Sequence, residues 1–299
     1  MEHSPLGRSG PLVSRIALGC MSLPVSDARL SIRIVHSAVD AGINLIDTAD
    51  LYDKGLNEET VGHALEGRRD RVVLATKVGN RWRPDGDAWD WDPSPDHVRK
   101  AVEESLRRLR TDRIDLYQLH GGTLQDPIDE LIGLFEDLKA EGKILHYGIS
   151  SIRPRVIRTW VERSGLTSVM TQYGVADRRP DEEVLPLLAG KGIGVIARGV
   201  LAKGMLCGKE AGAFAGHDRD DMLKASEAVR TCSDGERSPV QTAIRFALHS
   251  GAVTSVAVGV STPTQLEEAA SVFSTPLLSD EEIELLSGSV PSLRYLEHR

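Results

Sequence analysis

The sequence predicts a (β/α)8 TIM barrel, and three observations support this α/β fold class. Short apolar runs of strand length alternate with longer amphipathic stretches of helix length along the 299 residues. Eight such strand–helix units follow one another, as in a barrel of parallel strands. A Gly-x-Gly-x-x-Gly fingerprint does not follow the first strand, which disfavours the alternative of a doubly wound open sheet. We expect a single domain over residues 1–299, with an N-terminal hairpin and an extra C-terminal helix.

The expected strands are apolar runs bounded by turn residues. In chain order they cover residues 15–18, 44–46, 72–76, 114–119, 144–149, 168–172, 194–197 and 255–258. The expected helices cover residues 28–41, 58–66, 95–109, 127–141, 154–164, 182–190, 239–249 and 263–271, with the extra helix at 280–287. Several begin with proline or a capping side chain and end at glycine, which is the usual asymmetry of helix termini.

Two connections are much longer than the others. Residues 79–94 follow the third strand and residues 199–238 follow the seventh. Both leave the C-terminal face of the barrel, where barrel active sites form. Loops of this length without clear strands are usually functional or mobile, so we expect both to border a site.

Composition excludes several classes of function. The net charge is −8 and no basic tract stands out, which argues against a nucleic-acid partner. No apolar run approaches the roughly 18 residues of a membrane span, and the first ten residues lack an apolar signal region. Cys20, Cys207 and Cys232 lie far apart without metal-ligand spacing. We therefore expect a reduced, cytoplasmic protein without a membrane contact or a metal site.

Four polar side chains occupy matching places at or just past the ends of three expected strands. Asp47 and Tyr52 follow the second strand, Lys77 follows the third, and His120 follows the fourth. If these strands are neighbours in a barrel, all four side chains converge at its C-terminal end. Taken singly, each has a structural explanation: a turn cap, a rim aromatic, a solvated strand end and a backbone-bonded histidine. Their shared position favours a catalytic site.

The chemistry of such a site would centre on Tyr52. A free tyrosine is a poor acid at neutral pH, because its pKa is about 10, and a neighbouring cation stabilises the tyrosinate. Lys77 can supply that cation, Asp47 can orient it, and His120 can orient a carbonyl oxygen beside the phenol. Carbonyl reduction needs a proton donor where negative charge grows on oxygen. Since no amino-acid side chain supplies a hydride, a nicotinamide cofactor is implied.

At this point the chain resembles the aldo-keto reductase superfamily, which comprises nicotinamide-dependent (β/α)8 barrels. The Asp-Thr-Ala-x-x-Tyr segment, the lysine and the histidine carry the resemblance, and His-Gly-Gly-Thr at residues 120–123 is similar to bacterial oxidoreductases of the superfamily. Further matching motifs lie at residues 5–7, 18–21, 42–52, 77–79, 115–120, 148–151, 172–173 and 259–268. The resemblance implies that Asp47, Tyr52, Lys77 and His120 form the catalytic tetrad, with Tyr52 as general acid.

The resemblance also implies a set of cofactor contacts along the chain. Besides Asp47, the implied cofactor-binding residues are Gly19, Cys20, Met21, Ser150, Ser151, Gln172, Tyr173, Arg198, Gly199, Leu201, Lys203, Gly204, Gly259, Ser261, Thr262, Gln265 and Glu268. Among them, Ser150, Ser151 and Gln172 would hold the carboxamide and Tyr173 would stack near the nicotinamide ring. The stretch 198–204 would follow the pyrophosphate, and residues 259–268 would surround the adenosine end.

The resemblance favours NADPH, while NADH or dual use stays open. Members that prefer NADPH often carry Arg or Lys in the segment equivalent to 261–265, and this chain has none there. The expected substrate pocket comprises Tyr52, Trp82, Trp89, Trp91 and His120. Aromatic side chains there suit an apolar or aryl carbonyl compound, although the three tryptophans could equally anchor their loop to the barrel.

Two other functions remain alternatives at the level of sequence. One is a nicotinamide-binding regulatory or sensor protein with little turnover, which tight cofactor binding without reduction would indicate. The other is a Schiff-base lyase that uses Lys77 as its nucleophile, which borohydride trapping would reveal. Neither the physiological substrate nor the oligomeric state can be read from these residues.

Overall fold

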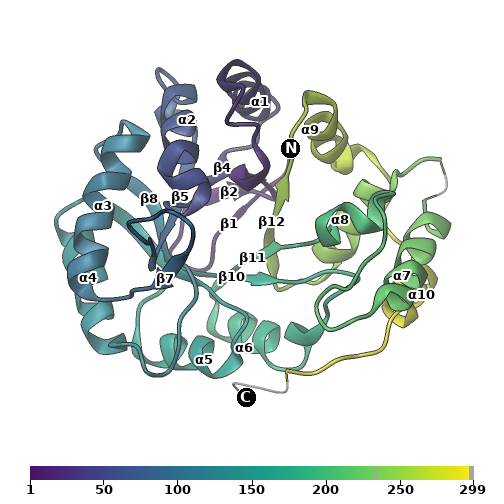
Figure 1. Cartoon of the computed structure of the whole chain (residues 1–299). Helices are drawn as coiled ribbons and strands as arrows, with labels where there is room; N and C mark the ends of the chain where they lie inside the picture. Colours follow the sequence, from purple (N-terminus) through teal and green to yellow (C-terminus); the bar gives the residue numbers. More distant parts are fainter. Residues whose placement is uncertain (234, 296–299) are drawn as a thin grey trace.

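The computed structural model describes residues 1–233 and 235–295, and its centre is a closed barrel of parallel strands (Figure 1). The strand order around the barrel is β10-β11-β12-β3-β4-β5-β8-β9. These strands are β3 (Ile16–Gly19), β4 (Leu45–Asp47), β5 (Val73–Val78), β8 (Ile114–Leu119), β9 (Ile144–Ser150), β10 (Ser168–Gln172), β11 (Gly194–Arg198) and β12 (Val253–Gly259). Consecutive barrel strands are neighbours, so the (β/α)8 TIM barrel is confirmed.

Helices surround the barrel on its outer side (Figure 1). They are α1 (Ala28–Asp40), α2 (Leu56–Ala64), α3 (Pro95–Leu109), α4 (Ile128–Ala140), α5 (Pro154–Arg163), α6 (Val184–Lys191), α7 (Arg219–Thr231), α8 (Pro239–His249), α9 (Pro263–Ala270) and α10 (Asp280–Gly288). Ser94, Ser238 and Thr262 cap α3, α8 and α9 with side-chain oxygens, each directly before a proline at the helix start. The capping chemistry expected from the sequence therefore sets these boundaries.

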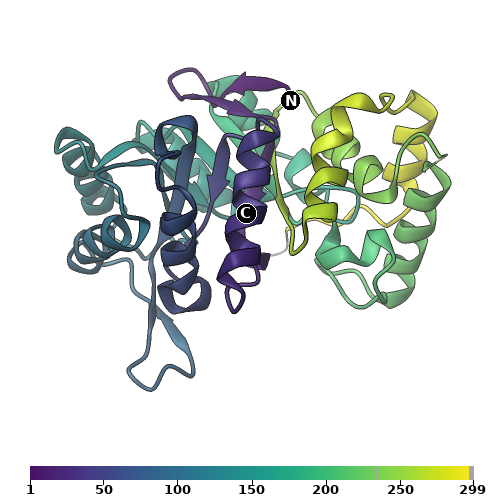
Figure 2. The same ribbon diagram turned by 90° about the horizontal axis from the view of Figure 1, so that it is seen from above.

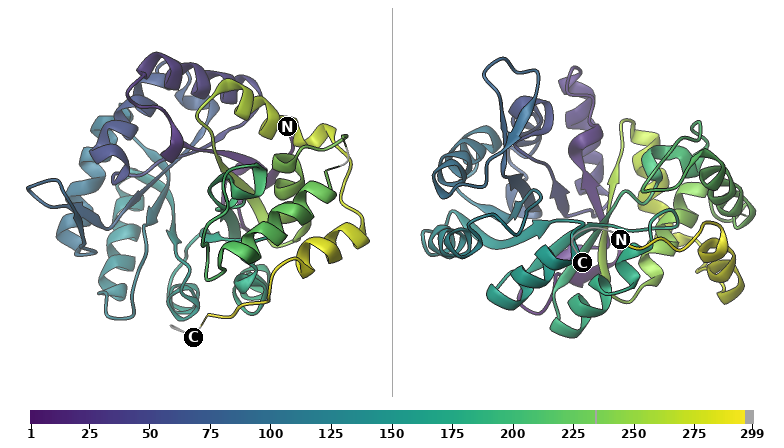
Figure 3. Two further views of the ribbon diagram at one scale, coloured as in Figure 1. Left: turned by 45° about the vertical axis from the view of Figure 1, so that its right-hand side comes forward. Right: turned by 60° about the horizontal axis from the view of Figure 1, so that its bottom comes forward.

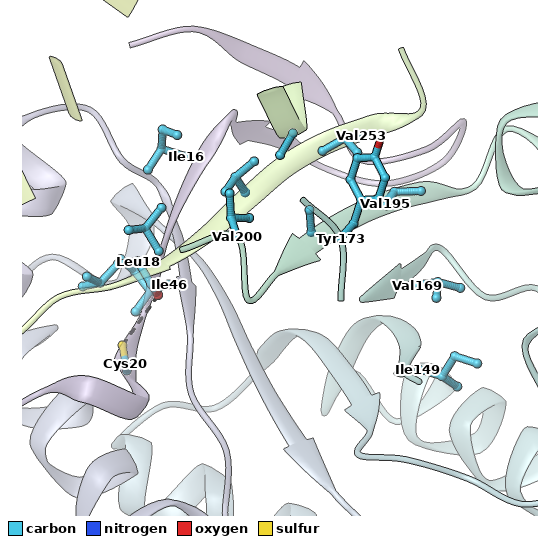
Figure 4. Close-up of a cluster of buried hydrophobic side chains, with 14 of the residues drawn as sticks. Ile16, Leu18, Cys20, Ile46, Ile149, Val169, Tyr173, Val195, Val200 and Val253 are labelled. Atoms are coloured by element: carbon cyan, nitrogen blue, oxygen red, sulfur yellow. Dashed lines mark hydrogen bonds between the residues drawn. The ribbon is translucent and has the colours of Figure 1, made fainter. Parts of the chain in front are cut away.

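Alternation along the strands separates two apolar regions. Inward-facing side chains such as Leu45, Leu116 and Met170 fill the barrel interior together with Leu6 and Val13. The last two come from the N-terminal hairpin of β1 (His3–Pro5) and β2 (Leu12–Ser14). Outward-facing side chains form a second, larger cluster with the helices, part of which Figure 4 shows. The expected N-terminal hairpin is present and contributes directly to the core.

The two long connections are more ordered than the sequence suggested. Residues 80–91 form an antiparallel hairpin of β6 (Asn80–Trp82) and β7 (Trp89–Trp91), which projects away from the barrel in Figures 2 and 3. The connection 199–238 contains α7, whose first turn is capped by Asp218. This helix was missed because its sequence is strongly polar, and its buried side chains are few: Met222, Ala225, Ala228 and Val229. An apolar stripe that narrow is a weak helix signal.

The extra C-terminal helix is also present as α10, which packs beside α7 (Figure 3). Over the described ranges, no helix has the length and apolar character needed to cross a membrane.

Candidate active site

The four expected catalytic side chains meet at the C-terminal end of the barrel, and the lysine ammonium lies between them. Lys77 Nζ donates to Asp47 Oδ2 at 2.7 Å, to the Thr48 carbonyl at 2.7 Å and to the Tyr52 hydroxyl at 3.3 Å. The Tyr52 and His120 rings meet edge to face, with centroids 5.9 Å apart. All three ammonium donors are therefore used, and one of them supports the phenol oxygen.

Burial divides this group into two halves. Lys77 and Asp47 are 1 % and 4 % exposed, whereas Tyr52 and His120 are partly exposed. Burial alone would lower the pKa of Lys77, but Asp47 and Tyr52 outweigh it, so the pKa of Lys77 is raised and the ammonium persists. Burial raises the pKa of Asp47, while Lys77 opposes that shift. The buried half is a fixed ion pair, and the exposed half is what a small molecule could reach.

His120 is neutral in this environment. Burial, followed by the charges of Lys77 and Arg198, lowers the pKa of His120 to about 3. Its Nδ1 is buried and has no hydrogen-bond partner among the described residues. A neutral imidazole carries one N–H and one acceptor nitrogen. His120 can thus orient a carbonyl oxygen by hydrogen bonding without competing with Tyr52 as an acid near neutral pH.

Gln118 joins this group, although the sequence analysis did not select it. Its Nε2 donates to Asp47 Oδ1 at 3.3 Å, on the carboxylate oxygen that Lys77 does not use. The side chain is fully buried, and β5 and β8 pair Lys77 with Gln118 in register. Alternation along residues 114–119 could have shown it, because Leu116 and Gln118 share the inward face. Gln118 fixes the orientation of the carboxylate that holds the lysine.

Asn57 is a second polar residue that joins the group and was not among the expected site residues. It is fully buried in the first turn of α2. Its Oδ1 accepts from the Thr48 hydroxyl at 2.8 Å and its Nδ2 donates to the Cys20 carbonyl at 2.9 Å. The turns after β3 and β4 are therefore locked together. Tyr52 starts the 3-10 segment Tyr52–Gly55 directly before α2, so this lock helps to place the phenol.

The three tryptophans of the β6–β7 hairpin have different roles. Trp82 Nε1 donates to the Leu51 carbonyl at 3.1 Å, next to Tyr52, and Trp82 packs edge to face on Trp89 at 5.6 Å. Trp89 is 52 % exposed. Trp91 is only partly exposed and anchors the base of the hairpin. Trp82 and Trp91 thus match the anchoring interpretation, and a pocket role for any of the three stays a prediction.

The anchor formed by Trp91 packs against Gly79 and against Gly121, which is the residue after His120. The Trp91 indole lies close to both glycines. A Cβ added to Gly79 would stand 2.6 Å from the ring, and a Cβ added to Gly121 would stand 3.3 Å from it. Its Nε1 donates to Asp126 Oδ1 at 2.9 Å, and Asp126 also accepts from the Thr123 backbone and hydroxyl. Gly121, directly after His120, leaves room for this packing.

The expected nicotinamide contacts divide between the two faces of the strands. Ser150 is the last residue of β9 and Ser151 follows it, and both side chains are buried. Gln172 is the last residue of β10 and lies in register with Arg198 on β11. The NH1 of Arg198 donates to Gln172 Oε1 at 3.2 Å. The structure does not bring Tyr173 to this group. Its side chain is 5 % exposed and packs in the outer apolar cluster near Val195 and Val253 (Figure 4).

Strand alternation explains this difference. Met170 and Gln172 face inward, so Tyr173 faces the helices. Burial and the neighbouring Asp181 raise the pKa of Tyr173, as expected for a phenol away from solvent. The expected stacking of Tyr173 on a nicotinamide is therefore not supported, and we correct it to a packing role.

The remaining expected cofactor residues line the neighbouring ends of β3, β11 and β12. Gly19 and Gly259 are in register on adjacent strands. Met21 is 66 % exposed, whereas Cys20 is buried, and its burial raises the pKa of the thiol. Gly199, Leu201, Lys203 and Gly204 follow β11. Ser261 and Thr262 directly precede α9, whereas Gln265 and Glu268 lie within it.

Side-chain contacts at the start of α9 are internal. Thr262 accepts from the Gln265 backbone amide at 3.2 Å, and Gln265 Oε1 accepts from the Ser261 amide and hydroxyl at 2.8 and 3.1 Å. In the described part of the chain, Lys203 has no carboxylate within ion-pair distance and is exposed. This end of the site therefore offers an exposed cation and a capped helix terminus to an anionic group.

Comparison with known proteins gives consistent matches. A profile described as the Aldo/keto reductase family matches residues 15–290. An uncharacterized oxidoreductase, YqkF, from Bacillus subtilis (strain 168) is 42% identical over 308 residues and covers 100% of both chains. The holo form of the aldo-keto reductase AKR11C1 from Bacillus halodurans superposes with a TM-score of 0.92 at 42% identity, covering 100% of this chain and 99% of that one. An NADH-specific methylglyoxal reductase from Escherichia coli (strain K12) is 30% identical over 90% of this chain and 92% of its own.

Proposed function

The chain belongs to the aldo/keto reductase family, and from that premise we propose that it reduces an aldehyde or ketone with NADPH. The observation that supports this proposal most directly is the contact of Lys77 Nζ with the Tyr52 hydroxyl at 3.3 Å, backed by the ion pair to Asp47 at 2.7 Å. When the phenol loses its proton, the fixed ammonium beside it stabilises the negative charge of the phenolate. That is the requirement for a general acid acting on a carbonyl oxygen.

Each residue of the site has one task in this proposal. Tyr52 donates its proton to the carbonyl oxygen as negative charge develops there. Lys77 stabilises the resulting phenolate, while Asp47 and Gln118 hold the lysine in place. His120, neutral because of burial and nearby cations, directs its ring toward the same oxygen. A bound nicotinamide supplies the hydride, which no residue of the chain can provide.

The residues at the C-terminal ends of β9, β10, β11 and β12 fit such a cofactor. Ser150 and Ser151 supply hydroxyls and Gln172 supplies an amide at the ends of β9 and β10, and these are groups that could bind a carboxamide. The exposed ammonium of Lys203 and the α9 terminus suit phosphate groups. NADPH is proposed on the family resemblance. Because residues 261–265 contain no Arg or Lys, NADH is the alternative to be measured beside it.

The proposed substrate is a small carbonyl compound, without a nucleic-acid or membrane partner. We place the activity in the cytoplasm, since all three cysteines are free thiols, as a reducing compartment would keep them.

The test measures oxidation of NADPH and of NADH in parallel, with a reactive aryl aldehyde, for the wild type and Tyr52→Phe. We expect reduction that falls at least about 100-fold in the variant, the lower range for a positioned general acid, while cofactor binding persists. Tyr52→Phe loses only a hydroxyl, so equal loss of cofactor binding would make Tyr52 structural. Tight binding without turnover across a panel of carbonyls would contradict the reductase proposal and favour the sensor alternative.

A further inference from the structure

Arg198 stands on the inner face of the barrel at the end of β11. Its strand register pairs it with Gln172, and its NH1 donates to Gln172 Oε1 at 3.2 Å. Ile196, two residues earlier, faces the interior core, so alternation directs Arg198 inward as well. Its guanidinium is partly exposed. Arg198 is thus tied to the site rather than extended into solvent along the following loop.

The charges around this guanidinium do not cancel. Lys77 and Asp47 form a neutral pair, and His120 is uncharged. Within residues 1–233 and 235–295, no carboxylate lies within the 4.0 Å ion-pair distance of Arg198. The charge of Arg198 nevertheless acts on the tetrad: together with burial and Lys77, it lowers the pKa of His120. Counted over Asp47, Lys77, His120 and Arg198, the charge is therefore about one positive unit, and Arg198 is its source.

The same space must hold a nicotinamide ring if the proposed function is correct. Hydride transfer requires the reacting atoms to lie about 3–3.5 Å apart, and Tyr52 and His120 fix where the carbonyl would be. The ring would then lie between these side chains and the strand ends of Gln172 and Arg198. The reduced ring is uncharged, whereas the oxidised ring carries a positive charge.

We infer that Arg198 makes the site discriminate between the redox forms of its nicotinamide, binding the reduced form more tightly than the oxidised form. This inference rests on the proposed function. Two like charges a few ångströms apart repel each other in a partly solvated site. The ring is the only part of the dinucleotide whose charge changes, so this repulsion acts only on the oxidised form. Such a cation speeds release of the oxidised cofactor and so limits its inhibition of carbonyl reduction.

The experiment compares dissociation constants for NADPH and NADP⁺ at equilibrium, by protein fluorescence or calorimetry, without any carbonyl substrate. Arg198→Met removes the charge and keeps a long apolar side chain, while Arg198→Lys keeps the charge. Lys203→Met is the matched control, because it removes an exposed cation from the same strand-to-helix connection. Thermal unfolding of each variant confirms that it is folded.

We expect the wild type and Arg198→Lys to bind NADPH about tenfold more tightly than NADP⁺. A charge repulsion equivalent in free energy to one pKa unit changes a dissociation constant tenfold. Arg198→Met should bring the two constants together, mainly through tighter binding of NADP⁺. Lys203→Met should weaken both forms equally and leave the ratio unchanged.

Two results would overturn the inference. Equal weakening of both forms by Arg198→Met would show that the guanidinium serves the phosphates, as the sequence analysis expected. An unchanged pair of constants would show that it faces solvent. Failure of the wild type to bind either nucleotide would instead refute the proposed function itself, so the two failures are distinguishable.

Discussion

Replacing Lys77 with methionine removes the cation of the buried ion pair and leaves the Asp47 carboxylate behind. The two side chains are 1 % and 6 % exposed, and their N–O distance is 2.7 Å. Methionine fills a similar volume without a charge or a donor. The carboxylate retains only the Gln118 amide at 3.3 Å, and the Thr48 carbonyl loses its 2.7 Å donor. The variant therefore isolates the energetic role of the ammonium.

The magnitude follows from these contacts. Breaking a buried pair by removing one partner costs about 3–5 kcal/mol of unfolding free energy, because it leaves an uncompensated charge. The Thr48 carbonyl adds a buried acceptor without a donor, worth about 1–3 kcal/mol. We expect Lys77→Met to lose about 4–8 kcal/mol at pH 8, which is the sum of these two contributions. Asp47→Asn combined with Lys77→Met should lose clearly less, because that double variant buries no charge.

The loss should also depend on pH with a definite sign. Without Lys77, burial raises the pKa of Asp47 still further above the value of about 3.9 that it has in an unfolded chain. A carboxyl of this kind contributes stability below the unfolded pKa and loses it as the pH rises through the folded pKa. The gap between Lys77→Met and the wild type should therefore narrow from pH 8 to pH 5.

The assay is urea unfolding followed by tryptophan fluorescence and circular dichroism at both pH values. Arg83→Met serves as the control, because Arg83 pairs with Asp90 at 2.6 Å with both side chains about half exposed, and such surface pairs contribute little. Equal stability of Lys77→Met and the wild type at pH 8 would refute the reasoning, as would a gap that widens toward pH 5.

Two further predictions concern the histidine and the glycine beside Trp91. The pKa of His120 is lowered to about 3, below its unfolded value near 6.5, so the unfolded state binds the proton first. The wild type should therefore lose stability relative to His120→Leu as the pH falls from 6.5 toward 5. Parallel melting curves at pH 7.5 and 5 test this, and a constant difference in stability between the two proteins contradicts it. Gly79→Ala should destabilise the fold by about 1–3 kcal/mol, since Gly79 has a φ of +123° and its Cβ would stand 2.6 Å from the Trp91 ring. The control is Gly133→Ala within α4, where nothing lies within 4 Å of the new Cβ. This substitution should be neutral or stabilise the fold by up to about 1 kcal/mol. Equal effects of the two substitutions on stability would exclude Trp91 as the cause.

The barrel could be predicted from the sequence because each of its elements carries its own local signal. The strand at residues 114–119 is an apolar run that the structure reproduces without a shift, and the helices beginning at Pro95 and Pro239 start where proline and a serine cap predict. The matching places of Asp47, Lys77 and His120 at strand ends likewise predicted that these side chains converge.

What could not be predicted depends on contacts between distant segments. The polar surface of α7 gave it too little apolar periodicity to be recognised, although it packs on α8 and α10. Tyr173 was assigned to the cofactor from motif resemblance, whereas alternation on β10 turns its ring outward. Alternation places Gln118 on the inward face, but its role could not be predicted because it depends on Asp47, 71 residues earlier in the chain.

Closure of the barrel has a consequence for how the chain is made and folded. β3 pairs with β12, and the Ser255 hydroxyl donates to the Ser14 carbonyl 241 residues earlier. The turn after β1 likewise reaches the segment between α6 and β11, where the Arg8 amide donates to the Gly192 carbonyl. During synthesis from the N-terminus, β3 can pair with β4 but lacks its second neighbour until β12, the last barrel strand, has left the ribosome. Until then both edges of the growing sheet are open to other chains, so aggregation during synthesis should depend on how quickly β12 arrives.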